Sequence, residues 1–139
     1  MPSPFVLKDA SVVLNGVDLS DHVKQVETPY EVAAQDATAM GSSTKKSIPG
    51  LKDAKVSLTF LQDFATAKVD ATIWPLYNAG TSFVLVIKPT SAAVSATNPS
   101  YTQTVFVKNY NPISGAVGSI ADVKIDFEIS SGDVVRATT

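Results

Sequence analysis

Hydrophobic and polar residues alternate along much of this chain with the period of two residues that is typical of a β-strand. The clearest case is ADVKIDFEIS, residues 121–130, where Val123, Ile125 and Phe127 alternate with charged residues. The segments KVSLTFLQD and YTQTVFVKNY predict further half-buried strands, and HVKQVE is a weaker candidate. SFVLVIKP is a continuous apolar run stopped by proline, which predicts a strand covered on both faces.

Two shorter patterns predict a turn and a helix. SVVLNGVDLS places Asn15-Gly16 between apolar residues, and this pair favours a two-residue hairpin because both turn positions need positive φ. VDATIWPLYNAG has helical spacing and ends on Gly80. Because proline is tolerated in a first turn but not inside a helix, Pro75 predicts a short helix that begins near Thr72. The expected core residues of this helix are Ile73, Trp74 and Leu76.

Two stretches, residues 36–50 and residues 90–100, show no regular pattern, and loops of this length are uncommon in compact domains unless they have a function. With 139 residues, of which 45% are hydrophobic, the chain is expected to form a single domain over residues 1–139. The predicted fold class is mainly β: an antiparallel two-sheet β-sandwich or partial barrel, with one short flanking helix and long loops.

Charge is unevenly distributed, although the net charge is only −2. Residues 36–55 hold four lysines against two aspartates, whereas residues 1–35 hold two lysines against five acidic residues. The segment from residue 109 onward is acidic as well, with two basic side chains against four acidic ones. The basic segment is either solvated surface or a loop that docks on acidic faces of neighbouring copies. Two adjacent lysines, Lys45 and Lys46, are too small a cluster to predict a nucleic-acid interface.

The residues for catalysis or metal binding are missing from the sequence. There is no cysteine, which excludes disulfides and thiolate metal sites. His22 is the only histidine, no motif pairs it with a nucleophile, and Asp21 should point away from it in an extended segment. GSSTKKSIPG lacks the Gly-Lys-Ser/Thr ending of a phosphate loop. We expect no enzyme, no cofactor and no metal. The N-terminus has no secretory pattern, so synthesis in a cytoplasm is expected.

Three stretches taken together resemble a known family: LNGVDLSDHVKQV, then DATAMGSSTKKSIPGLKDAKVSLTFLQDF, then KVDATIWPLYNAGTSFVLVIKP. Their order and spacing are similar to those of the major tail tube proteins of long non-contractile-tailed double-stranded DNA bacteriophages (siphophages), especially those that infect actinobacteria. The likeness covers roughly residues 12–89. Its most specific part is TAMGSSTKKSIPGLKD, followed by a strand and ATIWPL.

The resemblance implies a structural protein of the virion that is made in the bacterial host cytoplasm. Its subunits would form hexameric rings whose sheets join into one inner barrel, and the rings would stack into a tube. The implied partners are other copies, the tape-measure protein, and the tail terminator and distal tail proteins. DNA would pass non-specifically through the lumen, and no membrane binding is implied. Some relatives carry an additional C-terminal immunoglobulin-like domain, which is not expected here because the chain ends soon after the last strand.

The resemblance also assigns a role to the basic loop, as an assembly arm that contacts neighbouring subunits. Its expected inter-subunit residues are Asp36, Met40, Lys45, Lys46, Ile48, Pro49, Leu51 and Lys52. An acidic lumen would repel the phosphates of DNA and let it slide, which is the reverse of a basic DNA-binding groove. The hypothesis for the lumen-facing acidic residues is the row that shares one strand face: Asp122, Asp126 and Glu128.

Other functions fit the same pattern of strands. A ring-forming tail adaptor or terminator, or a secretion-tube protein, would share the fold and the ring but not indefinite stacking. A monomeric β-sandwich binding module would usually present aromatic residues in its loops, and residues 36–50 contain none.

Overall fold

The computed structural model of the protein describes residues 5–41 and 43–139. Ser42, in the expected basic loop, and residues 1–4 of the N-terminal segment lie outside these residues. The fold is mainly β and antiparallel with one short α-helix, as the sequence predicted. The strands are β1 (Ser11–Leu14), β2 (Val17–Asp18), β3 (Val23–Glu27), β4 (Tyr30–Asp36), β5 (Ser47–Leu61), β6 (Phe83–Lys88), β7 (Ser100–Tyr110) and β8 (Asp122–Ala137), with a 3₁₀ turn, η1 (Ser20–His22), and a helix, α1 (Val69–Ala79).

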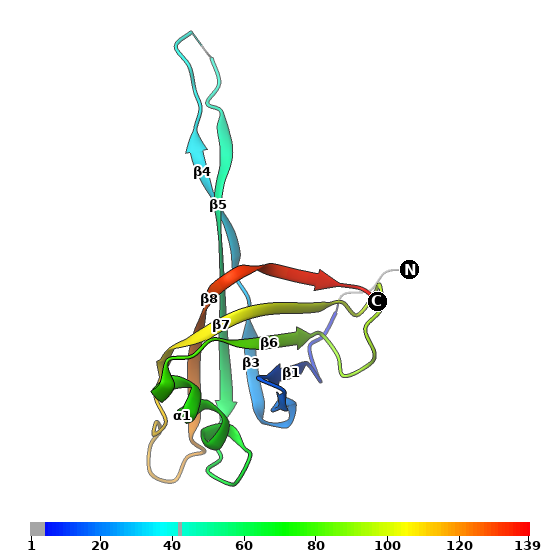
Figure 1. Cartoon of the computed structure of the whole chain (residues 1–139), viewed down its shortest axis with the longest axis vertical. Helices are drawn as coiled ribbons and strands as arrows, with labels where there is room; N and C mark the ends of the chain where they lie inside the picture. The colour runs from blue at the N-terminus through cyan, green and yellow to red at the C-terminus, as the bar shows by residue number, and fades with distance from the viewer. Residues whose placement is uncertain (1–4, 42) are drawn as a thin grey trace.

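The strands form one curled, antiparallel sheet in the order β2-β1-β6-β7-β8-β5-β3, with β4 pairing only with β5. The β1–β2 turn has the positive φ angles expected of it, 51° at Asn15 and 82° at Gly16. Figure 1 shows the sheet wrapped into a half-barrel, with α1 at one end and the β4–β5 hairpin projecting from the other. Of the two expected forms of the β fold, a sandwich or a partial barrel, the single curled sheet has the form of a partial barrel.

The core lies between the concave face of the sheet and α1. Alternate residues of the central strands point into it, so that Phe60 of β5 and Phe127 of β8 are completely buried. Phe127 meets the edge of the Phe83 ring at a centroid distance of 5.8 Å. Burying one such aromatic side chain stabilises the fold by about 1.5–3 kcal/mol. β6 is covered on one face only, because Val84 is 47% exposed, so the prediction that this strand is covered on both faces is wrong.

Helix α1 begins three residues earlier than predicted, at Val69, with Pro75 inside it. The carbonyl of Asp63 accepts the Asp70 N–H at 3.1 Å, and this bond fixes the first turn upstream of the proline. Gly80 ends the helix with a left-handed φ of 65°, as expected. This helix, the only α-helix among the described residues, is not long and apolar enough to cross a membrane.

One residue of the helix is not where the sequence analysis placed it. Ile73 and Leu76 are buried against the sheet, whereas Trp74 is 45% exposed. The indole of Trp74 packs on the Tyr77 ring at a centroid distance of 5.5 Å on the outer face of α1. The core assignment of Trp74 is therefore wrong, because a position adjacent to Ile73 is turned about 100° away from it on a helix.

The segment expected to be a loop over residues 36–50 is largely a β-ribbon. β4 and the first half of β5 pair from Tyr30↔Ala54 to Asp36↔Ser47, leaving only residues 37–46 as a loop. The register shifts between Val32 and Ala34, opposite Gly50. A Cβ at Gly50 would lie 3.0 Å from the carbonyl oxygen of Ala33, which explains the glycine at this position. We call residues 30–53 the arm and residues 37–46 the arm tip.

The arm separates from the body where β5 and β8 part. The last pair between them is Lys55↔Glu128, after which β8 continues along β7 as far as Ala137. Thr102 faces Val135 but Thr104 faces Ser131, so β8 carries extra residues around Gly132, whose φ is 67°. This bulge bends β8 away from β5. In Figure 1 the end of β8 therefore runs across the sheet while β5 and β4 continue outward.

The other unassigned segment, residues 90–100, is held by one buried side chain. The Asn98 amide donates to the carbonyl of Ala92 at 2.8 Å, and its oxygen accepts the Thr90 N–H at 3.1 Å. Asn98 is only 5% exposed, so the segment is an ordered turn on the body of the protein.

Candidate assembly surfaces

The arm contributes nothing to the core of its own chain. All seven residues of β4 and the first seven of β5 are exposed. They include apolar side chains, among them Val32 at 49%, Ile48 at 57% and Leu51 at 86% exposure. A two-stranded ribbon is at best marginally stable in water without a face to pack on. The arm therefore has the composition of a surface that is completed by contact with something else.

The arm tip is closed by one threonine. The Thr38 hydroxyl accepts the Lys46 N–H at 2.8 Å, and the Ala37 N–H donates to the Lys46 carbonyl at 2.8 Å. The Asp36 carboxylate accepts the Thr38 N–H at 2.9 Å, and this hydrogen bond lowers the pKa of Asp36. Met40 is fully exposed at the end of this turn.

The structure brings the expected inter-subunit residues together on one projecting element. Asp36 is the last residue of β4, the next three residues of the set lie in the arm tip, and the last four lie on β5. None of them is buried. In order along the arm they are Asp36, Met40, Lys45, Lys46, Ile48, Pro49, Leu51 and Lys52.

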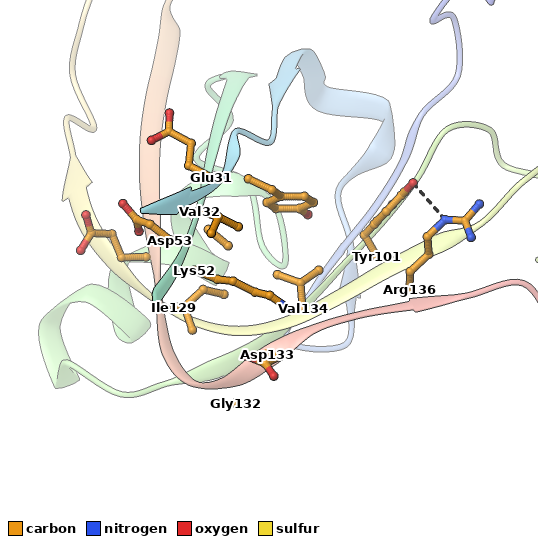
Figure 2. A pocket seen from close by; sticks show the side chains of 13 residues that line it. Glu31, Val32, Lys52, Asp53, Tyr101, Ile129, Gly132, Asp133, Val134 and Arg136 are labelled. Carbon is orange, nitrogen blue, oxygen red and sulfur yellow. Dashed lines mark hydrogen bonds between the residues drawn. The ribbon is translucent and has the colours of Figure 1, made fainter. Parts of the chain in front are cut away.

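A groove of about 470 Å³ lies where the arm and β8 separate, and we call it the fork groove. Figure 2 shows Val32 and Lys52 on its arm side, with Val134 and Asp133 on the side of the β8 bend. The lining also includes the Tyr30 and Tyr101 rings, whose centroids are 6.2 Å apart. Burial raises the pKa of the Tyr30 hydroxyl. The floor of the groove is apolar and aromatic.

The rim of the fork groove is acidic. Four carboxylates line it against two cationic side chains, although Asp53 lies 3.7 Å from Lys55 Nζ and Glu128 lies 2.9 Å from Lys108 Nζ, so that Glu31 and Asp133 are the rim carboxylates outside these ion pairs. Arg136 is engaged locally, because its Nε donates to the Tyr101 hydroxyl at 3.3 Å, a bond drawn in Figure 2. The acidic residues of the rim are Glu31, Asp53, Glu128 and Asp133, and the basic ones are Lys52 and Arg136.

Asp122, Asp126 and Glu128 lie on the face of the sheet opposite the core, as the alternation of β8 requires. Each has a polar partner on another strand of the same sheet. Lys24 Nζ is 2.6 Å from Asp122 and Lys108 Nζ is 2.9 Å from Glu128.

The face that carries the acidic row is balanced in charge. The Ser57 hydroxyl donates to Asp126 at 2.8 Å, and lysines from four strands lie around the row. The acidic residues here are Glu27, Asp122, Asp126 and Glu128, and the basic residues are Lys24, Lys55, Lys108 and Lys124. The carboxylates therefore do not make this face acidic as a whole.

His22 is held between two carboxylates, which the sequence analysis did not predict. Its Nδ1 lies 2.8 Å from Asp21, and its Nε2 lies 2.8 Å from Asp63 in the segment before α1. Asp21 faces the ring because residues 20–22 form a 3₁₀ turn instead of an extended strand. Hydrogen bonds to Asp21 and Asp63 raise the pKa of His22, and the pKa of each carboxyl is lowered. The trio links η1 to the segment before α1, and Lys68 Nζ lies 4.0 Å from Asp21 at its edge.

The described residues contain no group of three or more His, Cys, Asp or Glu side chains that could hold a metal ion. Another polar contact away from the arm joins α1 to β7, where the Tyr110 hydroxyl donates to Asp70 at 2.7 Å. Burial raises the pKa of Tyr110 to about 12. These groups connect elements of the fold and do not surround a cavity.

Comparison with solved structures gives the fold a context. The SPP1 tail tube matches with a TM-score of 0.77 and 10% identity, over 98% of this chain and 80% of that chain. The fold is that of a phage tail tube protein. The tail of an empty gene transfer agent particle, with C6 symmetry, matches with a TM-score of 0.75 and 11% identity, over 93% of this chain and 96% of that one.

A third structure with this tail tube fold comes from the end of a tube. The tube-terminating cap of the anti-feeding prophage matches with a TM-score of 0.75 and 12% identity, over 100% of this chain and 94% of that chain. No family model and no curated protein matches the sequence. At these identities the likeness is one of fold.

Sequence reasoning missed β4 and with it the fork groove. Tyr30 and Val32 flank the polar Glu31, but Ala33 and Ala34 follow Val32 directly, so the alternation is too short to predict a strand. No local signal identified Tyr101 and Val134 as groove residues, because they come from β7 and from the bent end of β8, which pair with each other far along the chain from the arm.

Proposed function

We propose that this chain is a tail tube protein of a siphophage, and that it forms hexameric rings which stack into a conduit for DNA around the tape-measure protein. The protein is structural and has no catalytic role. It belongs to the virion and is made in the host cytoplasm. Tail terminator and distal tail proteins would bind the two ends of the tube.

The arm is the observation that carries this proposal. The hairpin has fourteen exposed strand residues, and apart from Tyr30 at its base, whose hydroxyl donates to Gln103 at 3.2 Å, they add little to the stability of their own chain. Its side chains gain burial only against another molecule, and Ile48 and Leu51 are the largest apolar surfaces on its β5 strand. Likeness in fold to the SPP1 tail tube and the gene transfer agent tail supports other copies as that molecule.

Ring formation is supported by the open edges of the sheet. β3 lies at one edge, and the short β2 lies at the other beside β1. Unpaired N–H and C=O groups along such edges are templates for pairing with another chain. Pairing between edges of successive copies would close the sheets into a ring and leave no exposed edge.

We place the charge-balanced face of β8 at the lumen. Balanced charge gives DNA phosphates no continuous basic track, so DNA would slide without the counterion release that makes a DNA binder stick. Changing Asp122→Asn, Asp126→Asn and Glu128→Gln leaves four lysines unopposed by these three carboxylates. Tubes of this variant should retain short linear duplex DNA in a salt-dependent manner but not closed circular DNA, which has no end to thread. Equal retention of both forms would place the row outside the lumen.

The experiment that tests the function is negative-stain electron microscopy of the purified chain over a concentration series, with size-exclusion chromatography of the same samples. Long tubes of uniform width with a central channel are the expected result. A monomer at every concentration would refute the proposal and leave the likeness as one of fold alone.

A ring-forming cap or adaptor is the second candidate. The anti-feeding prophage cap matches this chain over its whole length with a TM-score of 0.75, close to the values of the tube proteins. Isolated rings that never stack would favour this function. Addition of a preformed tube end then separates a cap, which stops growth, from a tube subunit that needs an initiator.

A further inference from the structure

The fork groove is open in the single chain and has a defined chemistry. Its volume of about 470 Å³ is that of a pocket which holds several side chains. An apolar floor, with Val32 and Val134 on opposite walls, lies beneath a rim that carries four carboxylates against two cations. An occupant that fits this groove needs an apolar side chain to fill it and positive charge to face the rim.

The arm tip has this chemistry. Lys45 and Lys46 carry two positive charges against the single carboxylate of Asp36, whose hydrogen bond to Thr38 lowers its pKa and keeps it within the turn. Met40 is fully exposed beside them, and its unbranched side chain adapts to irregular pockets.

The tip does not reach the groove of its own chain. The groove lies at the base of the arm and reaches as far as Val32, and four residues of β4, positions 33–36, separate it from the tip, or roughly 15 Å of extended strand. In Figure 1 the arm continues straight outward from the body. A tip that enters a fork groove must therefore come from a second copy.

We propose that the fork groove is the receptor for the arm tip of a second copy, with Met40 seated between Val32 and Val134 and the two lysines facing Asp53 and Asp133. Tip and groove are different surfaces, so the contact is head-to-tail and can repeat along a stack without end. This inference rests on the proposed tube function and names the contact that would join successive rings.

A cross-linking experiment tests the contact, and the absence of native cysteine makes it clean. Two single variants, Met40→Cys and Val134→Cys, are mixed at equal concentration, assembled and oxidised. A disulfide-linked dimer that requires both variants is expected. The matched control replaces Val134→Cys by Val117→Cys, which is fully exposed in the loop between β7 and β8 at the end of the molecule opposite the arm.

The outcomes separate the contact from the tube. Normal tubes with no Met40–Val134 cross-link, or with equal cross-linking to the Val117→Cys control, would overturn the groove assignment and leave the tube function intact. If Val134→Cys forms its cross-link with a Cys placed at residue 5 or at the C-terminus, and not with Met40→Cys, the groove holds a chain end and the proposed contact is wrong. Failure of wild-type protein to assemble at all would overturn both.

Charge reversal provides a second, independent readout. Lys45→Glu with Lys46→Glu should raise the concentration needed for assembly by about tenfold or more, since like charges then face the rim. Adding Asp53→Lys and Asp133→Lys on the same chain should restore assembly to within about threefold of wild type. If the two pairs of residues did not interact, the two further substitutions would lower assembly again. Absence of the rescue would therefore refute the proposed contact between the tip lysines and the rim carboxylates.

Discussion

Removal of the arm separates the surface that folds the chain from the surface proposed to assemble it. Glu31 and Asp53 lie directly opposite each other at the base of the ribbon. One step closer to the body, the Lys55 N–H donates to the Pro29 carbonyl at 3.2 Å. Hydrogen-bonded pairs alternate along an antiparallel ladder, so Glu31 and Asp53 form the next hydrogen-bonded pair. Replacing residues 32–52 by Asn-Gly would close this pair with a two-residue turn.

The expected magnitudes follow from exposure. Every described residue from 31 to 53 is exposed, so the shortened chain loses no core contact, and its free energy of unfolding should change by less than about 1 kcal/mol. Assembly should respond far more strongly. Full burial of Met40, Ile48 and Leu51 in an interface would contribute about 1.5–3 kcal/mol each. Even about 4 kcal/mol in total corresponds to roughly a thousandfold rise in the concentration at which tubes form.

The assay pairs urea unfolding, followed by circular dichroism, with sedimentation of polymer over a wide range of protein concentration. An unchanged unfolding midpoint with loss of polymer is the expected combination. If the shortened chain assembled at the wild-type concentration, the arm would have no role in assembly. A large fall in the unfolding midpoint would instead show that the arm supports the fold of its own chain.

Three further predictions concern single residues. The difference in Tm between wild type and His22→Gln should be greatest at about pH 5–6. The raised pKa of His22 gives stability that is lost as pH rises through that pKa. The lowered pKa of each carboxyl partner gives stability that is lost as pH falls under acid conditions. A Tm difference that is independent of pH would rule out charge as the basis of this clamp. Gly50→Val should bend the arm against the Ala33 carbonyl, so that tube yield falls while Tm stays within about 1 °C; reduced Tm with normal tubes would contradict this. Phe127→Ala, at a fully buried site, should cost about 3–5 kcal/mol and lower Tm by roughly 10–20 °C in calorimetry, and a loss of only a degree or two would mean that the site collapses around the deletion.

The strands with one wet face could be predicted from the sequence because burial on a single face produces strict alternation. Val123, Ile125 and Phe127 are the example, and all three are completely buried. The arm could not be predicted in this way. Both of its faces are exposed, so no core selects a period of two along it, and Pro49-Gly50 resembles a break in a strand.

The errors at single positions have similar causes. Pro75 was given too much weight as a helix start, because a hydrogen bond from the preceding segment forms the first turn before the proline is reached. Trp74 was placed in the core on its size, although its position on the helix surface decides its burial. The His22 clamp depends on Asp63, forty-one positions away along the chain, and such a contact has no local signal.

An exposed ribbon with a free edge is also a hazard to the cell that makes it, since strands of this kind pair with one another into aggregates. The arm carries its own protection at the point where its register shifts. Pro49 offers no N–H to an incoming strand, and the extra residue of β5 at Gly50 and Leu51, opposite Ala33, breaks the flat, regular edge that cross-β stacking requires. The charged side chains along the same edge add repulsion between arms that meet side by side. In the assembly proposed above, unassembled subunits would therefore be protected from pairing arm to arm, and polymer growth would be confined to the orientation in which tip meets groove.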